Sequence, residues 1–341
     1  MKRLLASIFV LVLIVAVSGA VWFYSFAHSN LPPPQPQLPT PGQPAVPFEF
    51  TVKPGASLKS LSRQLTEAGL LPEPQLFWLL GRLTNQATGI QAGTYRLESP
   101  ITPLQLLKKL NDGDVVPVSV TFVEGTTFVE MRARLAKTEN VKTTLAGLSD
   151  ADVLQRIGAT ETHPEGLFFP DTYRFSAGTT DLEILKKSYQ AMQKKLAEAW
   201  AMRDADLPYA TPYEALIMAS IIEKETGKAE ERPLIGSVFI NRLKIPMRLQ
   251  TDPTIIYGMG QKYAGNIRKR DLTTDTPYNT YTRDGLPPTP IAMPGWGSIL
   301  AAVKPSQSDQ LYFVAKGDGS HYFSRSLEEH NRAVNKYQLG R

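Results

Sequence analysis

The chain has 341 residues, a formal net charge of +5 and a pI of about 9.2, with 42% hydrophobic and 20% charged residues. This length and composition allow a membrane segment plus about two globular domains, and the absence of cysteine excludes a disulfide scaffold, a thiol nucleophile and a lipoprotein anchor. Lysine and arginine do not form runs interleaved with aromatic residues, so nucleic acid is not an expected partner, whereas an anionic polymer or a membrane surface fits the mild positive charge.

The N-terminal residues predict a membrane anchor and a linker. Residues 1–4 form a short basic tail, and residues 5–26 are apolar and uncharged over the length of about 20 residues that spans a bilayer. Positive charge on the short side predicts a cytoplasmic N-terminus. The alternative is a cleaved signal peptide, but an apolar stretch longer than about 15 residues favours a retained anchor. Residues 27–47 include eight prolines and predict a semi-rigid linker that holds the next domain away from the membrane.

Residues 48–118 predict a small module of strands and helices. Gly55 and Gly125 each follow a short apolar run and precede an amphipathic pattern, and overlaying the two glycines aligns three apolar positions. The aligned pairs are Leu58 with Phe128, Leu61 with Met131, and Leu65 with Leu135. Residues 93–97 predict another strand and residues 103–110 another helix. These units resemble LysM-like modules, which bind the glycan of bacterial cell walls, and the alternative is a generic α+β module that serves packing or orientation.

Two helices are predicted next, at residues 150–158 and 182–203, from the spacing of their apolar residues. Between them, residues 165–175 gather aromatic side chains around a glycine and a proline, which predicts an ordered loop and a strand. Aromatic side chains of this kind either belong to the core or stack on sugars.

The helix around which the rest of the chain is organised is predicted at residues 211–227. Thr211 as N-cap, Pro212 at the first position and Glu214 three residues after the cap predict a capping box. Gly227 suits the left-handed residue that ends a helix. A buried stripe is predicted from Ala215, Met218, Ala219 and Ile222.

Glu225 is the next position of that stripe and lies one turn beyond Ile221 and Ile222, whereas Glu223 points to the opposite side. Desolvation by the isoleucines and the negative end of the helix dipole both predict a raised pKa for Glu225. A carboxyl that stays protonated near neutral pH can act as a general acid. The alternative is an ordinary glutamate near a helix end.

Beyond this helix, residues 232–243 predict a second amphipathic helix, and Asp252 either caps a short helix at 253–257 or belongs to the site. Residues 278–282 are rich in hydroxyl and amide groups and predict a strand, and residues 311–323 predict a hairpin through a Gly-Asp-Gly linker.

Several competing chemistries are excluded. The four histidines lack metal-like spacing, and no serine-hydrolase elbow, S-x-x-K motif, P-loop or dinucleotide fingerprint occurs, so neither a metal nor a cofactor is expected. What remains is a carboxylate-centred site with Tyr, Asn, Gln and Thr around it, which suits a polysaccharide.

Four motifs resemble those of the YceG-like family: ASIIEKET at 219–226, SVFINRL at 237–243, LQTDPT at 249–254 and YNTY at 278–281. The resemblance runs from the anchor to near the C-terminus, although the proline-rich linker is longer than expected for the family. It implies an α+β protein with an N-terminal transmembrane helix, a small LysM-like strand–helix module and a larger mixed α+β catalytic domain at residues 119–341. It also implies a single-pass inner-membrane location with that domain in the periplasm, and peptidoglycan synthases as partners.

The resemblance further implies an endolytic lytic transglycosylase that acts on nascent peptidoglycan and terminates strand elongation. Glu225, the glutamate followed by threonine, would protonate the oxygen between N-acetylmuramic acid and N-acetylglucosamine. As a carboxylate it would then accept the proton of the muramyl C6 hydroxyl, which closes on C1 and leaves a 1,6-anhydro end without consuming water. The candidates for binding sugar or orienting Glu225, each alternatively structural, are Gln250, Asp252, Tyr257, Asn279 and Tyr281.

Two other functions stay open. One is a muramidase-type hydrolase in which Asp252 or Glu223 supplies the second carboxylate that hydrolysis requires. The other is a non-catalytic scaffold that binds the cell wall.

Overall fold

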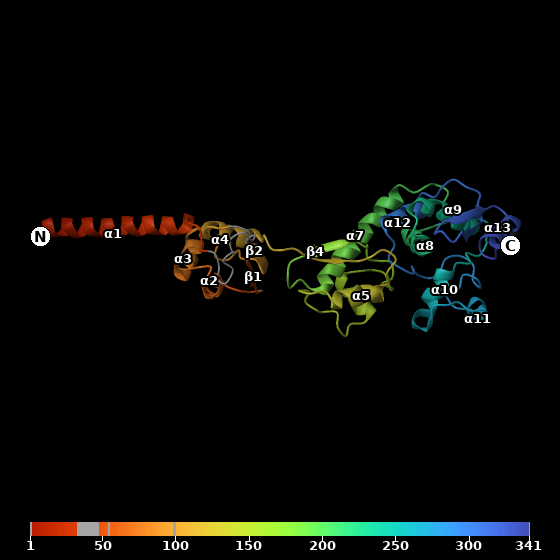
Figure 1. Ribbon diagram of the computed structural model, residues 1–341, viewed down its shortest axis with the longest axis horizontal. Coiled ribbons are helices and arrows are strands. Elements are labelled where there is room, and N and C mark those ends of the chain that lie inside the picture. Colours follow the sequence, from red (N-terminus) through yellow and green to blue (C-terminus); the bar gives the residue numbers. More distant parts are fainter. Residues whose placement is uncertain (1, 33–47, 54, 98–99, 341) are drawn as a thin grey trace. The chain divides into compact units, whose positions relative to one another are not determined.

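The computed structural model describes residues 2–32, 48–53, 55–97 and 100–340, with the backbone alone for residues 2–6. The chain divides into two compact units, which are described separately here (Figure 1). The small unit comprises Met1–Val118 and Arg174–Thr179, and the large unit comprises Ser119–Tyr173 and Thr180–Arg341.

The N-terminal helix α1 (Lys2–His28) ends in the core of the small unit. Its Ser7–His28 segment has a mean hydropathy of 2.4 and is long enough to cross a membrane. Ala27 and Leu31 are buried in the small unit's hydrophobic core, and the Leu31 amide donates to the Ile101 carbonyl at 2.9 Å. The helix therefore continues two residues past the predicted span and joins the folded unit directly.

The predicted proline-rich linker falls largely on residues 33–47, which lie outside the described residues. The residues on its two sides are described, and both pack on one hydrophobic core. Leu31 is buried in it, and Phe48, the first residue of β1 (Phe48–Val52), packs against it partly buried. The small unit thus begins at the end of α1, before the proline-rich stretch and not after it.

The small unit packs three helices against a two-stranded antiparallel sheet. Strand β1 pairs with β2 (Gly93–Leu97) so that Phe48 faces Leu97. The helices are α2 (Leu58–Glu67), α3 (Pro74–Leu83) and α4 (Pro103–Asp112). The fully buried side chains that fill the core include Leu61, Leu65, Phe77, Tyr95 and Leu106. Helix α3 was not predicted from the sequence.

The predicted repeat is present in the backbone. In the first copy, Gly55 (φ +77°) separates β1 from α2, and in the second, Gly125 (φ +74°) separates β3 (Val118–Thr121) from α5 (Phe128–Ala136). Such positive φ values favour glycine because an added Cβ is strained there. The six aligned apolar residues are all buried: Leu58, Leu61, Leu65, Phe128, Met131 and Leu135. This pattern fits a LysM-like module and a generic α+β module equally, so the LysM likeness stays a prediction.

The large unit is mainly helical. Its further helices are α6 (Asp150–Ile157), α7 (Asp181–Ala201), α8 (Pro212–Glu225), α9 (Arg232–Lys244), α10 (Asp252–Met259), α11 (Lys269–Thr273), α12 (Trp296–Val303) and α13 (Leu327–Tyr337). Strand β3 pairs with β4 (Thr172–Phe175), and β5 (Tyr312–Ala315) pairs antiparallel with β6 (His321–Ser324). The last pair confirms the predicted hairpin.

Helix α8 lies at the centre of the large unit, in contact with α7, α9, α10 and α12. All eight residues from Ala215 to Ile222 are buried, so the predicted one-sided stripe was too narrow. On α9, Gly236 permits close packing, because a Cβ there would lie 2.8 Å from the Ala301 carbonyl oxygen of α12 and 3.2 Å from Cδ1 of Ile222 on α8.

Three local predictions differ from the structure. Glu214 accepts from the Ala210 amide at 2.6 Å, one residue before the N-cap, while Thr211 accepts from the Glu214 amide as predicted. Gly227 is not left-handed, because the chain leaves α8 through Thr226 in an extended conformation (φ −143°, ψ 137°). Residues 278–282 form turns and not a strand, since side-chain hydrogen bonds from Asn279 fold this segment back on itself.

Candidate active site

A cavity of about 460 Å³ opens at the C-terminal end of α8. Its walls come from α8, α9, the segment before α10, both strands of the β5–β6 hairpin and α13. Its polar lining residues are Glu225, Arg242, Gln250, Thr251, Asp252, Tyr281, Tyr312, His321, His330 and Gln338. The cavity therefore combines one helix-end carboxyl with hydroxyl, amide and aromatic groups, a set suited to a polyhydroxylated ligand.

Glu225 is the last residue of α8 and is partly buried. Desolvation raises its pKa to about 7, and the nearby Asp252 acts in the same direction. The Thr251 hydroxyl opposes this by donating a hydrogen bond to Glu225 Oε1, and the more distant charge of Arg242 also lowers the pKa. Since a pKa near 7 leaves comparable amounts of acid and carboxylate at neutral pH, this side chain can both give and accept a proton.

Thr251 is held in place by two further buried threonines. Its amide donates to the Thr280 hydroxyl at 3.1 Å, and the Thr254 and Thr280 hydroxyls lie 2.9 Å apart. All three residues are at most 2% exposed. This cluster fixes the Thr251 hydroxyl toward Glu225, a role that the sequence analysis did not assign to it.

Asp252 does not cap the short helix α10. Its Oδ1 accepts a hydrogen bond from the Tyr281 hydroxyl at 2.7 Å, and both residues line the cavity. Burial raises the pKa of Tyr281, and the hydrogen bond to Asp252 adds to the shift. The predicted residues Asp252 and Tyr281 are thus brought together with Glu225.

Gln250 lines the same cavity in a strained backbone conformation. Its φ is +48°, in the left-handed region that non-glycine residues seldom adopt, and its amide donates to the Thr280 carbonyl at 3.1 Å. Such strain costs on the order of 1–3 kcal/mol and persists where the surroundings impose it, often at functional sites. The exposed Gln250 side chain is therefore available to a ligand.

Asn279 and Tyr257 are not among the lining residues. The buried Asn279 amide donates to the Asp271, Leu272 and Thr274 carbonyls at 3.1, 3.3 and 2.7 Å, and its Oδ1 accepts from the Tyr281 amide at 2.9 Å. It therefore positions the backbone that carries Tyr281. Tyr257 packs edge-on against Tyr278 and hydrogen-bonds Glu165, away from the cavity.

Glu165 is a second carboxyl with a raised pKa. It is 3% exposed, and desolvation raises its pKa to about 7. Its Oε1 accepts from the Phe128 amide at 3.0 Å at the start of α5, and Tyr257 supplies a second hydrogen bond. These internal partners give Glu165 a structural role, and it does not line the cavity described above.

Glu223 faces away from the cavity, as its position on the helix predicted. Its Oε2 accepts from the Gly295 amide at 2.9 Å, and its Oε1 lies 3.4 Å from Arg232 Nη2. The Glu223 side chain is 6% exposed and is absent from the cavity lining. Of the two carboxylates considered for hydrolysis, Asp252 is thus the one that the cavity contains.

The opposite wall is built on Arg242, which the sequence analysis missed. Its guanidinium donates to the Leu249 and Leu311 carbonyls, each at 2.7 Å, and lies 5.3 Å from the Tyr312 ring centroid. His330 stacks on Tyr312 at 5.2 Å, and its buried Nδ1 has no partner among the described residues. Burial lowers the pKa of His330, so a neutral imidazole faces the ligand space. The contacts of Arg242 with Leu311 and Tyr312 join residues about 70 positions apart, so local spacing does not reveal them.

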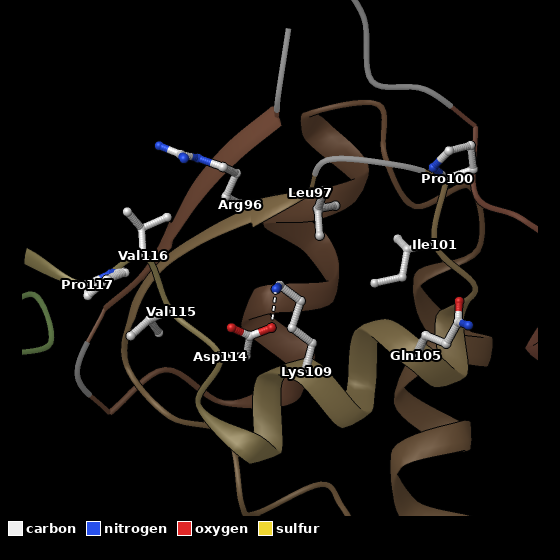
Figure 2. Close-up of a pocket in the computed structure, with 10 residues that line it drawn as sticks. All are labelled: Arg96, Leu97, Pro100, Ile101, Gln105, Lys109, Asp114, Val115, Val116 and Pro117. Carbon is white, nitrogen blue, oxygen red and sulfur yellow. Dashed lines mark hydrogen bonds and ion pairs between the residues drawn. The ribbon is translucent and has the colours of Figure 1, made fainter. Parts of the chain in front are cut away.

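The small unit has a cavity of its own, about 520 Å³, between β2 and α4 (Figure 2). Lys109 and Asp114 lie side by side in its lining and form an ion pair at 2.5 Å. Arg96, at its rim, pairs with Glu49 at 2.7 Å. Since Asp114 is paired with a lysine, the helix-end cavity is the stronger candidate for acid–base chemistry. No group of three or more metal-ligating side chains occurs among the described residues.

The fold and the site define an α+β protein with a cavity lined by a carboxyl of raised pKa, a geometry suited to acid–base chemistry. The sequence profile of the YceG-like family matches residues 50–336, and the chain belongs to this family. The endolytic murein transglycosylase of Bacillus subtilis (strain 168) is 32% identical over 300 residues, which cover 83% of this chain and 82% of the relative.

Two further similarities agree with membership of the YceG-like family. The endolytic murein transglycosylase of Streptococcus pneumoniae serotype 2 is 30% identical over 315 residues, covering 82% of this chain but 56% of the relative, so the chain spans little more than half of that protein. The crystal structure of a yceG-like protein from Listeria monocytogenes is 30% identical, with a TM-score of 0.54, and covers 84% of this chain and 98% of that one.

Proposed function

We propose that the chain is a lytic transglycosylase that cleaves peptidoglycan strands internally, with Glu225 as its single acid–base group. The observation that carries this proposal is a carboxyl whose pKa is raised to about 7 at the wall of a cavity. The names of the Bacillus subtilis and Streptococcus pneumoniae relatives support the substrate class.

The proposed reaction uses Glu225 twice. The protonated carboxyl gives its proton to the oxygen that links C1 of N-acetylmuramic acid to N-acetylglucosamine, and the C1–O bond breaks. The carboxylate formed then accepts the proton of the muramyl C6 hydroxyl as that oxygen bonds to C1. The products are a 1,6-anhydro end and a free N-acetylglucosamine hydroxyl, and Glu225 is protonated again. No water enters, so no second catalytic carboxylate is required, unlike in hydrolysis.

The residues around Glu225 have separate roles in the proposed reaction. Thr251 stabilises the carboxylate through its hydrogen bond, which favours release of the Glu225 proton in the first step. Gln250 and the Asp252–Tyr281 pair line the same cavity and are placed to bind sugar hydroxyls. Helix α1 would anchor the enzyme in the inner membrane with its basic N-terminus in the cytoplasm and the cavity in the periplasm. Cleavage of nascent strands there would end their elongation.

The test is product analysis with purified glycan strands and the full-length protein. We expect 1,6-anhydro ends from the wild type and no cleavage by Glu225→Gln, which keeps the shape of the side chain but cannot exchange the proton. Glu223→Gln, on the same helix but outside the cavity, is the matched control and should give the wild-type products. Cleavage by Glu225→Gln at the wild-type rate would contradict the proposal.

A muramidase-type hydrolase is the second candidate, because Asp252 shares the cavity with Glu225. That reaction would leave reducing ends and would stop in Asp252→Asn. We expect Asp252→Asn to retain anhydro products at a reduced rate, since the hydrogen bond from Tyr281 is altered and the chemistry is not.

A further inference from the structure

Helix α3 of the small unit carries two apolar stripes, and only one of them packs in the hydrophobic core. Phe77 and Leu80 face the core and are 0% and 4% exposed. Leu76, Leu79 and Leu83 recur at the 3, 4 spacing of a second stripe, in which Leu79 is 38% and Leu83 is 68% exposed. No described element covers Leu83, so this stripe meets something other than the protein's own core.

An aromatic and a cationic side chain stand beside this stripe. The Arg82 guanidinium lies 5.2 Å from the Trp78 ring centroid, one helical turn away on α3. Tryptophan is enriched where a membrane meets water, because its ring is apolar and its N–H is polar. Arginine extends its charge toward phosphate while its stem stays in apolar surroundings. The composition of this surface thus fits the boundary of a bilayer.

The length of α1 places that boundary at the small unit. Ser7–His28 has 22 residues, and at 1.5 Å per residue it is about 33 Å long, close to the hydrocarbon thickness of about 30 Å. Its end is already part of the small unit, since Phe23 and Phe26 pack against the core that buries Ala27. A bilayer spanned by α1 therefore leaves no gap before the small unit.

Helix α3 lies on the side that meets this bilayer. It contacts α1, and Figure 1 shows it at the end of the small unit from which α1 projects, with β1 and β2 at the opposite end. Trp22 and Tyr24, near the end of α1, are 57% and 66% exposed and mark the same level with aromatic side chains.

We propose that α3 is a second membrane contact, lying in the bilayer interface beside the transmembrane helix. Leu76, Leu79 and Leu83 enter the boundary between headgroups and acyl chains, and Arg82 meets lipid phosphate. Together with α1 this contact fixes the orientation of the small unit on the membrane. The inference rests on the proposed anchoring role of α1 and on no step of the proposed chemistry.

The absence of cysteine makes this proposal directly testable. Leu83→Cys, Thr51→Cys and Val12→Cys each accept one polarity-sensitive fluorophore in the full-length protein reconstituted into phosphatidylcholine vesicles. Thr51 is exposed on β1, at the far end of the small unit, and Val12 is exposed in the middle of α1. Quenching is measured with lipids brominated on the acyl chain and with aqueous iodide.

We expect brominated lipid to quench the Leu83 and Val12 labels strongly and iodide to quench them weakly, with the opposite result at Thr51. A Leu83 label quenched by iodide, together with a Val12 label quenched by lipid, would overturn the role of α3 and leave the anchor intact. A Leu83 label protected from both quenchers would show that a second copy or another protein covers α3, which also overturns the proposal. A Val12 label quenched by iodide would refute the anchor and with it the contact at α3.

Discussion

At the scale of single residues, the site depends on the balance between the protonated and the ionised form of Glu225. Desolvation favours the protonated acid, and the Thr251 hydroxyl favours the carboxylate by donating to it. The proposed reaction needs both forms in turn, so a pKa of about 7 serves it better than either extreme. Thr251 is then a positioning residue that sets this balance without touching the glycosidic oxygen.

Replacing Thr251 with valine tests this balance. Loss of the donated hydrogen bond raises the pKa of Glu225 further, because the bond stabilises the charged form. The first step requires protonated Glu225, so kcat/KM falls as pH rises through that pKa, and in Thr251→Val this fall should move to higher pH. Hydrogen bonds to charged groups contribute about 1.5–3 kcal/mol, so kcat should drop roughly tenfold or more. The measurement is the pH profile of anhydro-product formation.

Thr273→Val, on the exposed helix α11, is the matched control and should leave the profile unchanged. An alkaline limb that stays in place or moves to lower pH in Thr251→Val would show that the hydroxyl does not set the pKa of Glu225.

The candidate site was only partly visible in the sequence. Glu225 was predicted because its surroundings come from its own helix, where spacing reveals the face. Thr251 acts across 26 positions and Arg242 bonds a carbonyl 69 positions away, so neither role follows from local spacing, although both residues lie within the motifs LQTDPT and SVFINRL. Asn279 was grouped with the sugar-binding candidates because its amide suits either role, and only the coordinates show that the backbone uses its hydrogen bonds.

At the scale of elements, the position of Glu225 depends on how closely α9 and α12 approach α8. Gly236 sets this distance, since its missing side chain admits the Ala301 carbonyl and the Ile222 side chain. Protein interiors are close-packed, so an added methyl group at such a contact must displace a neighbour.

Gly236→Ala should therefore destabilise the protein, although alanine has the better helix propensity. Overpacking of a tight core contact costs about 1–3 kcal/mol, against a propensity gain of about 1 kcal/mol. Because the 2.8 Å approach is to a backbone oxygen, which cannot rotate away, we expect net destabilisation in urea unfolding. Gly227→Ala, where nothing lies within 4 Å and φ is not positive, should change the free energy of unfolding by less than about 0.5 kcal/mol. Equal stability of the two variants would contradict this account.

Elements with local signals were predicted better than those without. The strand–glycine–helix repeat and the β5–β6 hairpin follow from turn residues and spacing alone. Helix α3 was not predicted because it has two apolar stripes, one around Phe77 and one around Leu79. Together they obscure the helical spacing of apolar residues that would mark a single stripe. Residues 278–282 were predicted as a strand from their composition, but side-chain hydrogen bonds from Asn279 to carbonyls five to eight residues earlier override that preference.

At the scale of the whole molecule, the proline-rich stretch takes on a different role from the one its composition predicts. A spacer between anchor and domain would set the height of the domain above the membrane. Here Leu31 before the stretch and Phe48 after it pack on one hydrophobic core. If α1 anchors the protein as proposed, α1 sets the height of the small unit above the membrane, and the length of the stretch has no influence on it.

Inserting a second copy of residues 33–47 after Pro47 distinguishes the two roles. If α1 sets the height, energy transfer from a donor on Thr51→Cys to a dye at the membrane surface should be the same with and without the insertion. A spacer role predicts weaker transfer, because a proline-rich chain adds up to about 3.1 Å per residue. Cleavage of membrane-attached glycan strands should also be unchanged. Reduced transfer in a protein that retains its unfolding midpoint would show that the stretch, and not the end of α1, positions the small unit.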